Sequence, residues 1–174
     1  MAPRNIRVSW KSIVLGDGSL PRYQFQTWLA LHQKLATVDR LERWGIHVSK
    51  YCVLCDSGDE EDLPHLLFNC VYSRHIWEKL LGWIGENRQV QSWIQEMSWV
   101  TQRVKGNRAR VGILKFLFTS AVYHIWSERN ARRFQGNMRS SQDRLREIVR
   151  QLHLKGNQQP KWKQMLAQLN NYPN

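Results

Sequence analysis

The stretch YCVLCDSGDEEDLPHLLFNC, residues 51–70, decides how the chain folds because it contains every cysteine in the sequence. These are Cys52, Cys55 and Cys70, and with His65 they form the pattern Cys-x2-Cys-x9-His-x4-Cys. Zinc takes four nitrogen or sulfur ligands, and a tight turn lets a CxxC pair bring both sulfurs to one ion. The spacing therefore predicts one zinc ion held by Cys52, Cys55, His65 and Cys70. The alternative is a set of buried thiols with an unrelated histidine nearby.

The spacing also indicates what such a metal ion does. Four protein ligands leave no open position for water, so the pattern predicts a structural zinc. A helix is expected from about Pro64, a residue suited to a first turn. His65 and Cys70 lie about 140° apart around an ideal helix of ~3.6 residues per turn. We therefore expect His65 in a frayed first turn and Cys70 one turn or more inside the helix.

The composition favours a folded protein of a reducing compartment. Of the 174 residues, 42% are hydrophobic and nine are Trp, which is enough to build a core. An odd, sparse set of three cysteines argues against a secreted disulfide protein and favours the cytosol or the nucleus. We find no apolar run long enough for a membrane span, and no apolar centre of a signal peptide near the N-terminus.

The net charge of +12 is unevenly distributed along the chain. Residues 1–51 carry 8 basic and 3 acidic groups, residues 52–100 carry 3 and 8, and residues 101–174 carry 15 and 3. The cysteine segment is thus acidic, while the C-terminal part is strongly basic. A polyanion such as RNA or DNA is the natural partner of the C-terminal part. The alternative is that the charge only keeps a Trp-rich helical protein soluble.

Periodicity predicts an all-α fold, a helical bundle with a small Cys3His zinc knuckle. We expect an irregular lead-in over residues 1–22, a zinc-binding helical domain over 23–135 and a basic helical appendage over 136–174. Helices are predicted from Gln24, after a Thr37 cap, near Pro64, over 89–104, over 107–130, after Ser140 or Ser141, and from Pro160. The helix over 107–130 has a wide apolar stripe, which is typical of a central buried helix.

The run FQTWLALHQKLATVDRLERWGI (25–46), followed by CVLC, EDLPHLLFNC and SRHIW, resembles a known zinc-binding domain. That domain follows the reverse transcriptase in plant LINE-type (non-LTR) retrotransposons. The match covers roughly residues 10–84, and IWSERNARRF (125–134) resembles a segment downstream of the domain. Matching positions are Trp28, Leu35, Thr37, Leu41, Cys52, Cys55, Glu61, His65, Leu66, Phe68, Cys70 and Trp77.

Two departures from the family pattern are visible: Asp62 stands where the family often has Thr, and the gap between Cys55 and His65 is slightly long. The resemblance implies a module that helps a reverse transcriptase hold RNA or target DNA. The sequence has no polymerase, endonuclease or RNase H motif, so we expect no catalysis, and a fragment or stand-alone derivative of such an element.

Basic residues flank the predicted central helix and continue into the next one. They are candidate contacts for phosphate oxygens, although each alone could equally lie on a solvated helix face. The candidates are Arg103, Lys105, Arg108, Arg110, Arg129, Arg132, Arg133, Arg139, Arg144, Arg146 and Arg150. A different class of function also remains open, in which the chain is a protein-interaction adaptor that docks a partner through its C-terminal helices.

Overall fold

The computed structural model describes residues 10–169 and 173, and this part of the chain forms helices and no strand. One isolated antiparallel bridge pairs Tyr51 with Glu60. None of the helices in the described part has the length and apolarity needed to cross a membrane. In chain order the elements are α1 (Lys11–Val14), α2 (Pro21–Leu31), α3 (Val38–Arg43), η1 (His65–Asn69), α4 (Val71–Trp83), α5 (Trp93–Arg103), α6 (Ala109–Asn130), η2 (Ala131–Gln135), α7 (Ser141–Gly156) and α8 (Pro160–Leu166). The predicted all-α class is confirmed.

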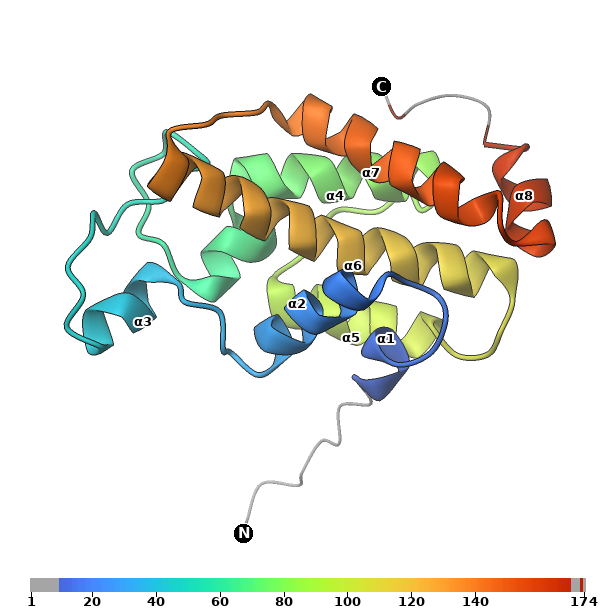
Figure 1. The fold of residues 1–174 in the computed structure, drawn as a ribbon, viewed down its shortest axis with the longest axis horizontal. Helices are drawn as coiled ribbons and strands as arrows, with labels where there is room; N and C mark the ends of the chain where they lie inside the picture. The colour runs from blue at the N-terminus through green and yellow to red at the C-terminus, as the bar shows by residue number, and fades with distance from the viewer. Residues whose placement is uncertain (1–9, 170–172, 174) are drawn as a thin grey trace, which may run out of the picture.

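The long helix α6 is the centre of the molecule. Every residue from Ile113 to Val122 is buried, so this helix is covered on all sides over its middle turns. Helices α2, α4, α5, α7 and α8 pack around it (Figure 1). Phe118 at its middle contacts the rings of Trp77 and Trp93, with centroid separations of 5.4 and 5.8 Å. The predicted central helix over 107–130 is confirmed.

The two C-terminal helices belong to this same core. Ser140 caps α7 by accepting a hydrogen bond from the Asp143 amide, as its place before the apolar stripe predicts. The stripe of α7 faces α4 and α6, and α8 lies across the first half of α6 (Figure 1). Leu145, Ile148, Val149, Leu152, Trp162 and Leu166 join the core cluster. The apolar stripes of α7 and α8 therefore pack against α4 and α6 and form part of the same core.

Part of the N-terminal segment is also structured. Residues 1–9 lie outside the described range, but residues 11–14 form the helical turn α1 rather than the expected irregular lead-in. Ile13 and Val14 are buried there, and this burial is what holds the turn in place. The predicted helix over 89–104 begins later, at Trp93, because Ser92 and Gln95 form a capping box at that point.

Candidate metal centre and its attachment to the helices

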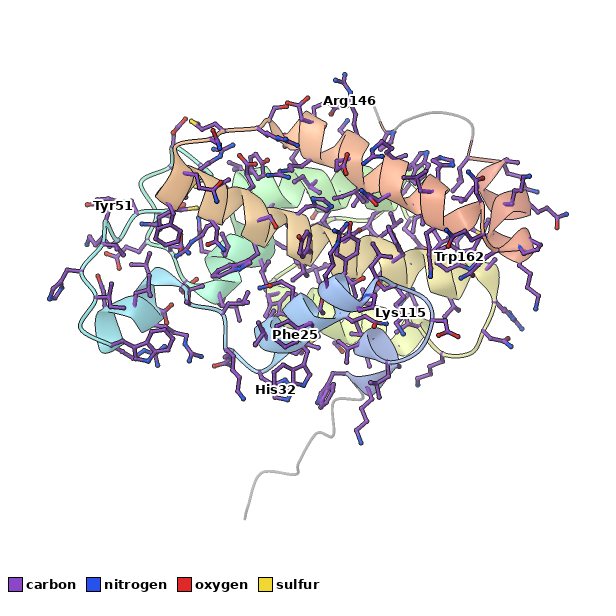
Figure 2. All side chains as sticks on the ribbon, viewed as in Figure 1. Phe25, His32, Tyr51, Lys115, Arg146 and Trp162 are labelled. Carbon is purple, nitrogen blue, oxygen red and sulfur yellow. The ribbon has the colours of Figure 1, made fainter. Side chains whose placement is uncertain are left out.

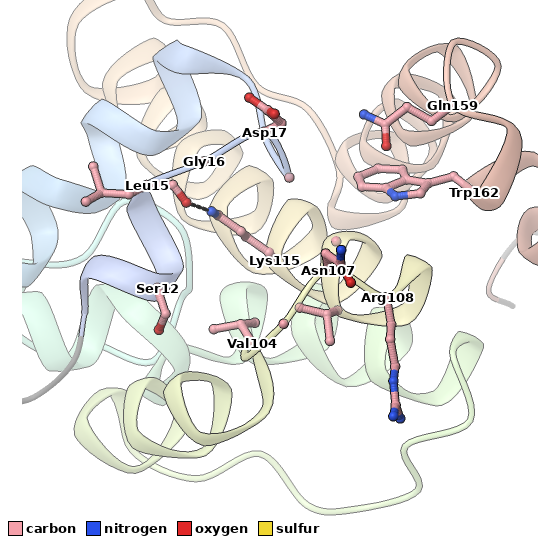
Figure 3. Close-up of a pocket in the computed structure, with 14 residues that line it drawn as sticks. Ser12, Leu15, Gly16, Asp17, Val104, Asn107, Arg108, Lys115, Gln159 and Trp162 are labelled. Carbon is pink, nitrogen blue, oxygen red and sulfur yellow. Dashed lines mark hydrogen bonds between the residues drawn. The ribbon is translucent and has the colours of Figure 1, made fainter.

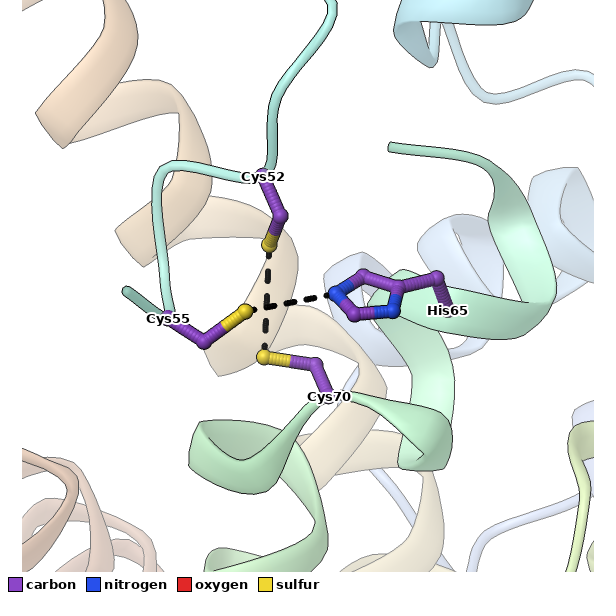
Figure 4. A group of neighbouring side chains, drawn as sticks. All are labelled: Cys52, Cys55, His65 and Cys70. Carbon is purple, nitrogen blue, oxygen red and sulfur yellow. Dashed lines mark hydrogen bonds between the residues drawn. The ribbon is translucent and has the colours of Figure 1, made fainter. Parts of the chain in front are cut away.

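Cys52, Cys55, His65 and Cys70 come together (Figure 4), in the part of the molecule where α6 ends (Figure 1). All four ligand atoms lie within 4.8 Å of one another. The Sγ atoms of Cys52 and Cys70 are 4.0 Å apart, and Cys55 Sγ is 3.4 Å from His65 Nε2. A tetrahedral zinc with bonds of about 2.3 Å to sulfur and about 2.1 Å to nitrogen needs edges of about 3.8 and 3.6 Å. The two measured edges are close to these values, so the predicted ligand set is gathered at the spacing that a tetrahedral zinc site needs.

A break in the helix places His65 and Cys70 on the same ion. Leu67 and Phe68 have non-helical backbone angles, and Phe68 takes the left-handed φ of 84°. The wide turn η1 thus ends before Cys70, which is the N-cap residue of α4. The expectation that Cys70 lies one turn or more inside a helix begun by His65 is wrong. The separation of about 140° on an ideal helix disappears because the helix is interrupted between the two ligands.

Two side chains just after Cys70 form hydrogen bonds with the backbone amide and carbonyl groups at this break. Ser73 Oγ accepts a hydrogen bond from the Phe68 amide at 3.0 Å and donates one to the Cys70 carbonyl. Arg74 Nε donates to the Phe68 carbonyl at 3.1 Å. The Phe68 ring is fully buried and stacks on Trp77, with 5.7 Å between centroids. Ser73 and Arg74 thus have a structural role at the break that the sequence did not predict.

Cys52 and Cys55 lie in a loop closed by a pair of main-chain hydrogen bonds. The Cys52 amide donates to the Asp59 carbonyl at 2.9 Å, and the Glu61 amide donates to the Lys50 carbonyl at 2.8 Å. On the other side of the site, the Asp62 carboxylate accepts a bond of 2.7 Å from the His65 amide. An Asp side chain performs this capping task as well as a Thr does. The departure from the family pattern at this position therefore leaves the site intact.

The buried thiols favour cation binding. The hydrogen bond between the Cys52 and Cys70 side chains lowers the pKa of Cys52 to about 5, and the Leu54 amide, 3.4 Å from the Cys52 sulfur, acts in the same direction. The same thiol–thiolate bond, together with burial, raises the pKa of Cys70. A bound zinc ion would hold both sulfurs as thiolates, because a metal-bound thiol is deprotonated.

A buried carboxylate joins the knuckle to the end of α6. The side chains of Glu61 and Arg129 are 0% and 1% exposed, and Arg129 Nη2 lies 2.6 Å from Glu61 Oε1. Arg133 Nη2 reaches Glu61 Oε2 at 2.9 Å, and its guanidinium also donates to two carbonyls of the knuckle. The Val38 amide at the start of α3 donates to the same carboxylate at 3.2 Å. One acid thus connects α3, the knuckle and α6.

A second buried acid, Glu128, connects the end of α6 to the start of α7 in the same way. Glu128 Oε1 accepts a bond from Arg132 Nε, and its Oε2 accepts one from Arg144 Nε, both at 2.8 Å. Burial acts to raise the pKa of Glu128, but the hydrogen bonds from Arg132, the Arg139 amide and Arg144 outweigh it and lower the pKa. Arg132 also donates to the Val53 carbonyl at 3.1 Å, between the first two cysteines.

These contacts divide the eleven candidate basic residues into two groups. Arg129, Arg132, Arg133 and Arg144 form ion pairs with Glu61 or Glu128, and their side chains are at most 12% exposed. Their guanidinium groups therefore hold the fold and are not presented to an external phosphate. Their partners are far away in sequence, so charge counting could not identify the pairs. The exposed group is Arg103, Lys105, Arg108, Arg110, Arg139, Arg146 and Arg150.

Residues 1–77 match the model of a protein family described as zinc-binding in reverse transcriptase. The match includes all four ligands and ends at Trp77, which packs on Phe68 at the break. The predicted resemblance to a zinc-binding domain of reverse transcriptases is confirmed for this part of the chain, and the metal of the Cys3His site is zinc. No curated protein and no solved structure matches the chain.

Proposed function

We propose that the chain is a nucleic-acid-binding module, derived from the region after the reverse transcriptase of a non-LTR retrotransposon, in which zinc has a structural role. The observation that carries the proposal is the unbalanced positive charge on the surface of residues 101–174. This segment has 15 basic and 3 acidic residues, and one of those acids, Glu128, is buried. An excess of exposed cations without matching carboxylates is the usual electrostatic footprint of a polyanion site.

The exposed basic residues are available for such contacts. No ion pair within the described residues joins Lys105, Arg108 or Arg139 to a carboxylate. Arg146 points outward from α7 (Figure 2), and its Nη1 is 3.8 Å from an exposed Asp143. Arg110 pairs with Glu86, and these side chains are 51% and 24% exposed. Surface pairs of this kind contribute only about 0–1 kcal/mol, so a phosphate can replace the carboxylate.

The zinc supplies rigidity rather than chemistry in this proposal. Three sulfurs and one imidazole fill a tetrahedral shell, which leaves no position for a reacting water molecule. The residues around the site complete the loop or attach it to α6. We therefore propose no enzymatic activity. The three thiols need a reducing compartment, cytoplasmic or nuclear, to remain metal ligands.

The adaptor hypothesis has less support. It requires apolar faces of the C-terminal helices to be free for a partner, and the stripe of α7 is buried against α4 and α6. Trp162 and Leu166 of α8 are each 5% exposed and also belong to the core. A protein partner bound through these helices would have to use their charged outer faces.

Fluorescence anisotropy with labelled RNA and DNA oligonucleotides tests the nucleic-acid proposal. Raising the salt concentration from about 50 to about 200 mM should weaken binding steeply, because each neutralised phosphate adds about 0.9 to the log–log slope on duplex DNA and about 0.7 on single strands. A triple variant should bind more weakly with a shallower slope; its changes are Lys105→Gln, Arg139→Gln and Arg146→Gln.

A control with the same loss of charge removes exposed cations elsewhere, by the changes Lys34→Gln, Arg43→Gln and Lys50→Gln. If both triple variants weaken binding equally, the interaction depends on net charge alone and the proposed surface is wrong. Binding that does not respond to salt, or the survival of a co-purifying protein partner after nuclease treatment, would favour the adaptor.

A further inference from the structure

A cavity of about 360 Å³ lies at the opposite end of α6 from the zinc site. Its walls are the loop after α1, the loop before α6, the first turns of α6 and the start of α8 (Figure 3). Trp162 forms one side, where its ring lies directly over Gly112: a Cβ at that glycine would overlap with Trp162 Cζ2. Lys115 projects from α6 into the space between this wall and the loop after α1.

Lys115 is the unusual feature of this cavity. The residue is 5% exposed, and its ammonium donates a hydrogen bond to the Leu15 carbonyl. Among the described residues no carboxylate lies within ion-pair distance of it. A lysine is rarely buried this far without a countercharge, because removing the ammonium from water is costly. Burial accordingly lowers the pKa of Lys115, and the charge of Asp17 only partly opposes this effect.

The surroundings favour an anion as the missing countercharge. The first turn of α6 begins at the cavity wall, with no side-chain cap and no acidic residue in that turn. Its free amides and the positive end of the helix dipole add to the charge of Lys115. Arg108 lies on the rim, where its exposed guanidinium extends away from Lys115 (Figure 3). Asp17 is the one carboxylate among the lining residues, and it is exposed to solvent.

We propose that this cavity binds a phosphate group, with the Lys115 ammonium as its central charge. Phosphate supplies the negative charge that the Lys115 ammonium lacks, and acceptor oxygens for its remaining N–H groups and for the free helix amides. The group could be the terminal phosphate of a nucleic acid or free inorganic phosphate, and the first of these rests on the proposed function. In either case the ligand neutralises Lys115 inside the protein.

Thermal unfolding of the zinc-loaded chain tests the site with inorganic phosphate as the probe. Phosphate at about five times its dissociation constant should raise Tm by roughly 2–4 °C relative to sodium chloride of equal ionic strength. Lys115→Met fills the same space without the charge, so it should lose this shift. Any general stabilisation by phosphate as an excluded salt remains in both proteins and cancels in the comparison.

Asp17→Asn is the second variant, because it distinguishes an external anion from a pairing within the chain. A phosphate site should bind its ligand more tightly once the nearby carboxylate is neutral, and the Tm shift should grow. If Asp17 were itself the partner of Lys115, the same change would lower Tm and phosphate would have no larger effect. That result, or equal phosphate shifts in the wild type and Lys115→Met, would overturn the proposal.

Two oligonucleotides of one sequence, with a 5′-phosphate or a 5′-hydroxyl, identify the source of the group. A nucleic-acid terminus predicts several-fold tighter binding of the phosphorylated strand by the wild type and equal binding by Lys115→Met. A Tm shift with no preference between the strands assigns the cavity to free phosphate. Binding of both strands with neither a preference nor a Tm shift would leave the nucleic-acid function standing and would remove the phosphate site.

Discussion

Replacing Glu61 by Gln should destabilise the protein far more than the same change at Glu60. The two residues are adjacent and both belong to the acidic loop of the knuckle. Glu60 is exposed and its carboxylate pairs with Lys50, a contact between side chains that are 67% and 50% exposed. Glu61 is completely buried and forms ion pairs with both Arg129 and Arg133. The pair of variants thus removes one negative charge from each of two very different environments.

The expected loss of stability in Glu61→Gln depends on the charged groups that stay buried after the substitution. Glu61→Gln leaves two guanidinium groups, with side chains 1% and 6% exposed, without a countercharge. Removing one partner of a buried ion pair costs about 3–5 kcal/mol, mainly because the other charge stays desolvated. Removing one partner of a surface pair costs about 0–1 kcal/mol. Since small domains are stable by only about 5–15 kcal/mol, Glu61→Gln should lose a large part of the total.

Urea unfolding followed by circular dichroism provides the free energies, with zinc present in equal excess for all proteins. Native mass spectrometry should still find one zinc in Glu61→Gln, because the four ligands remain, and Cys55→Ser provides the zinc-free reference. If Glu61→Gln and Glu60→Gln unfold within about 1 kcal/mol of each other, the ion pairs of Glu61 with Arg129 and Arg133 do not hold the knuckle to α6.

Two further predictions concern the helical core. Glu96 is buried; burial acts to raise its pKa, but hydrogen bonds from Arg88 and Trp77 lower it. The stabilising effect of the Glu96 carboxylate is therefore present above the unfolded pKa of about 4.3 and is lost as pH falls through the folded pKa. The free energies of unfolding of the wild type and Glu96→Gln, measured with urea, should differ near pH ~6 and converge below pH ~4. A difference that stays constant with pH would refute this prediction. Gly112→Ala should lower the stability by about 1–3 kcal/mol, because the new Cβ meets the Trp162 ring. Gly82→Ala, where a new Cβ has no atom within 4 Å, should raise the stability by up to about 1 kcal/mol. Equal changes in Tm for the two variants would show that Trp162 does not pack on α6 at Gly112.

The parts of the structure that sequence alone predicted depend on short-range patterns. The ligands Cys52, Cys55, His65 and Cys70 fall within 19 residues, and a metal tetrahedron restricts their spacing directly. Helices α6, α7 and α8 were predictable because each combines an apolar stripe of period ~3.6 with a cap, a break or a proline at its end. In the helices the relevant neighbours are three or four residues away, so the pattern and the structure follow from the same local geometry.

The break at Phe68 was not predictable, because a left-handed backbone is usual for Gly and rare for an aromatic residue. Its stabilisation comes from the fully buried ring and from Ser73 and Arg74, which become relevant only once the chain has folded.

The sequence by itself determined the metal, its four ligands, the helical class and the excess of positive charge in the C-terminal part. Only the tertiary structure decided which of those charges face solvent. Arg129 meets Glu61 across 68 residues and Arg144 meets Glu128 across two helices, and such pairs have no periodicity that a sequence could display. A buried arginine and an exposed one look identical in the sequence, because the cost of burial is balanced by a partner that only folding brings within reach.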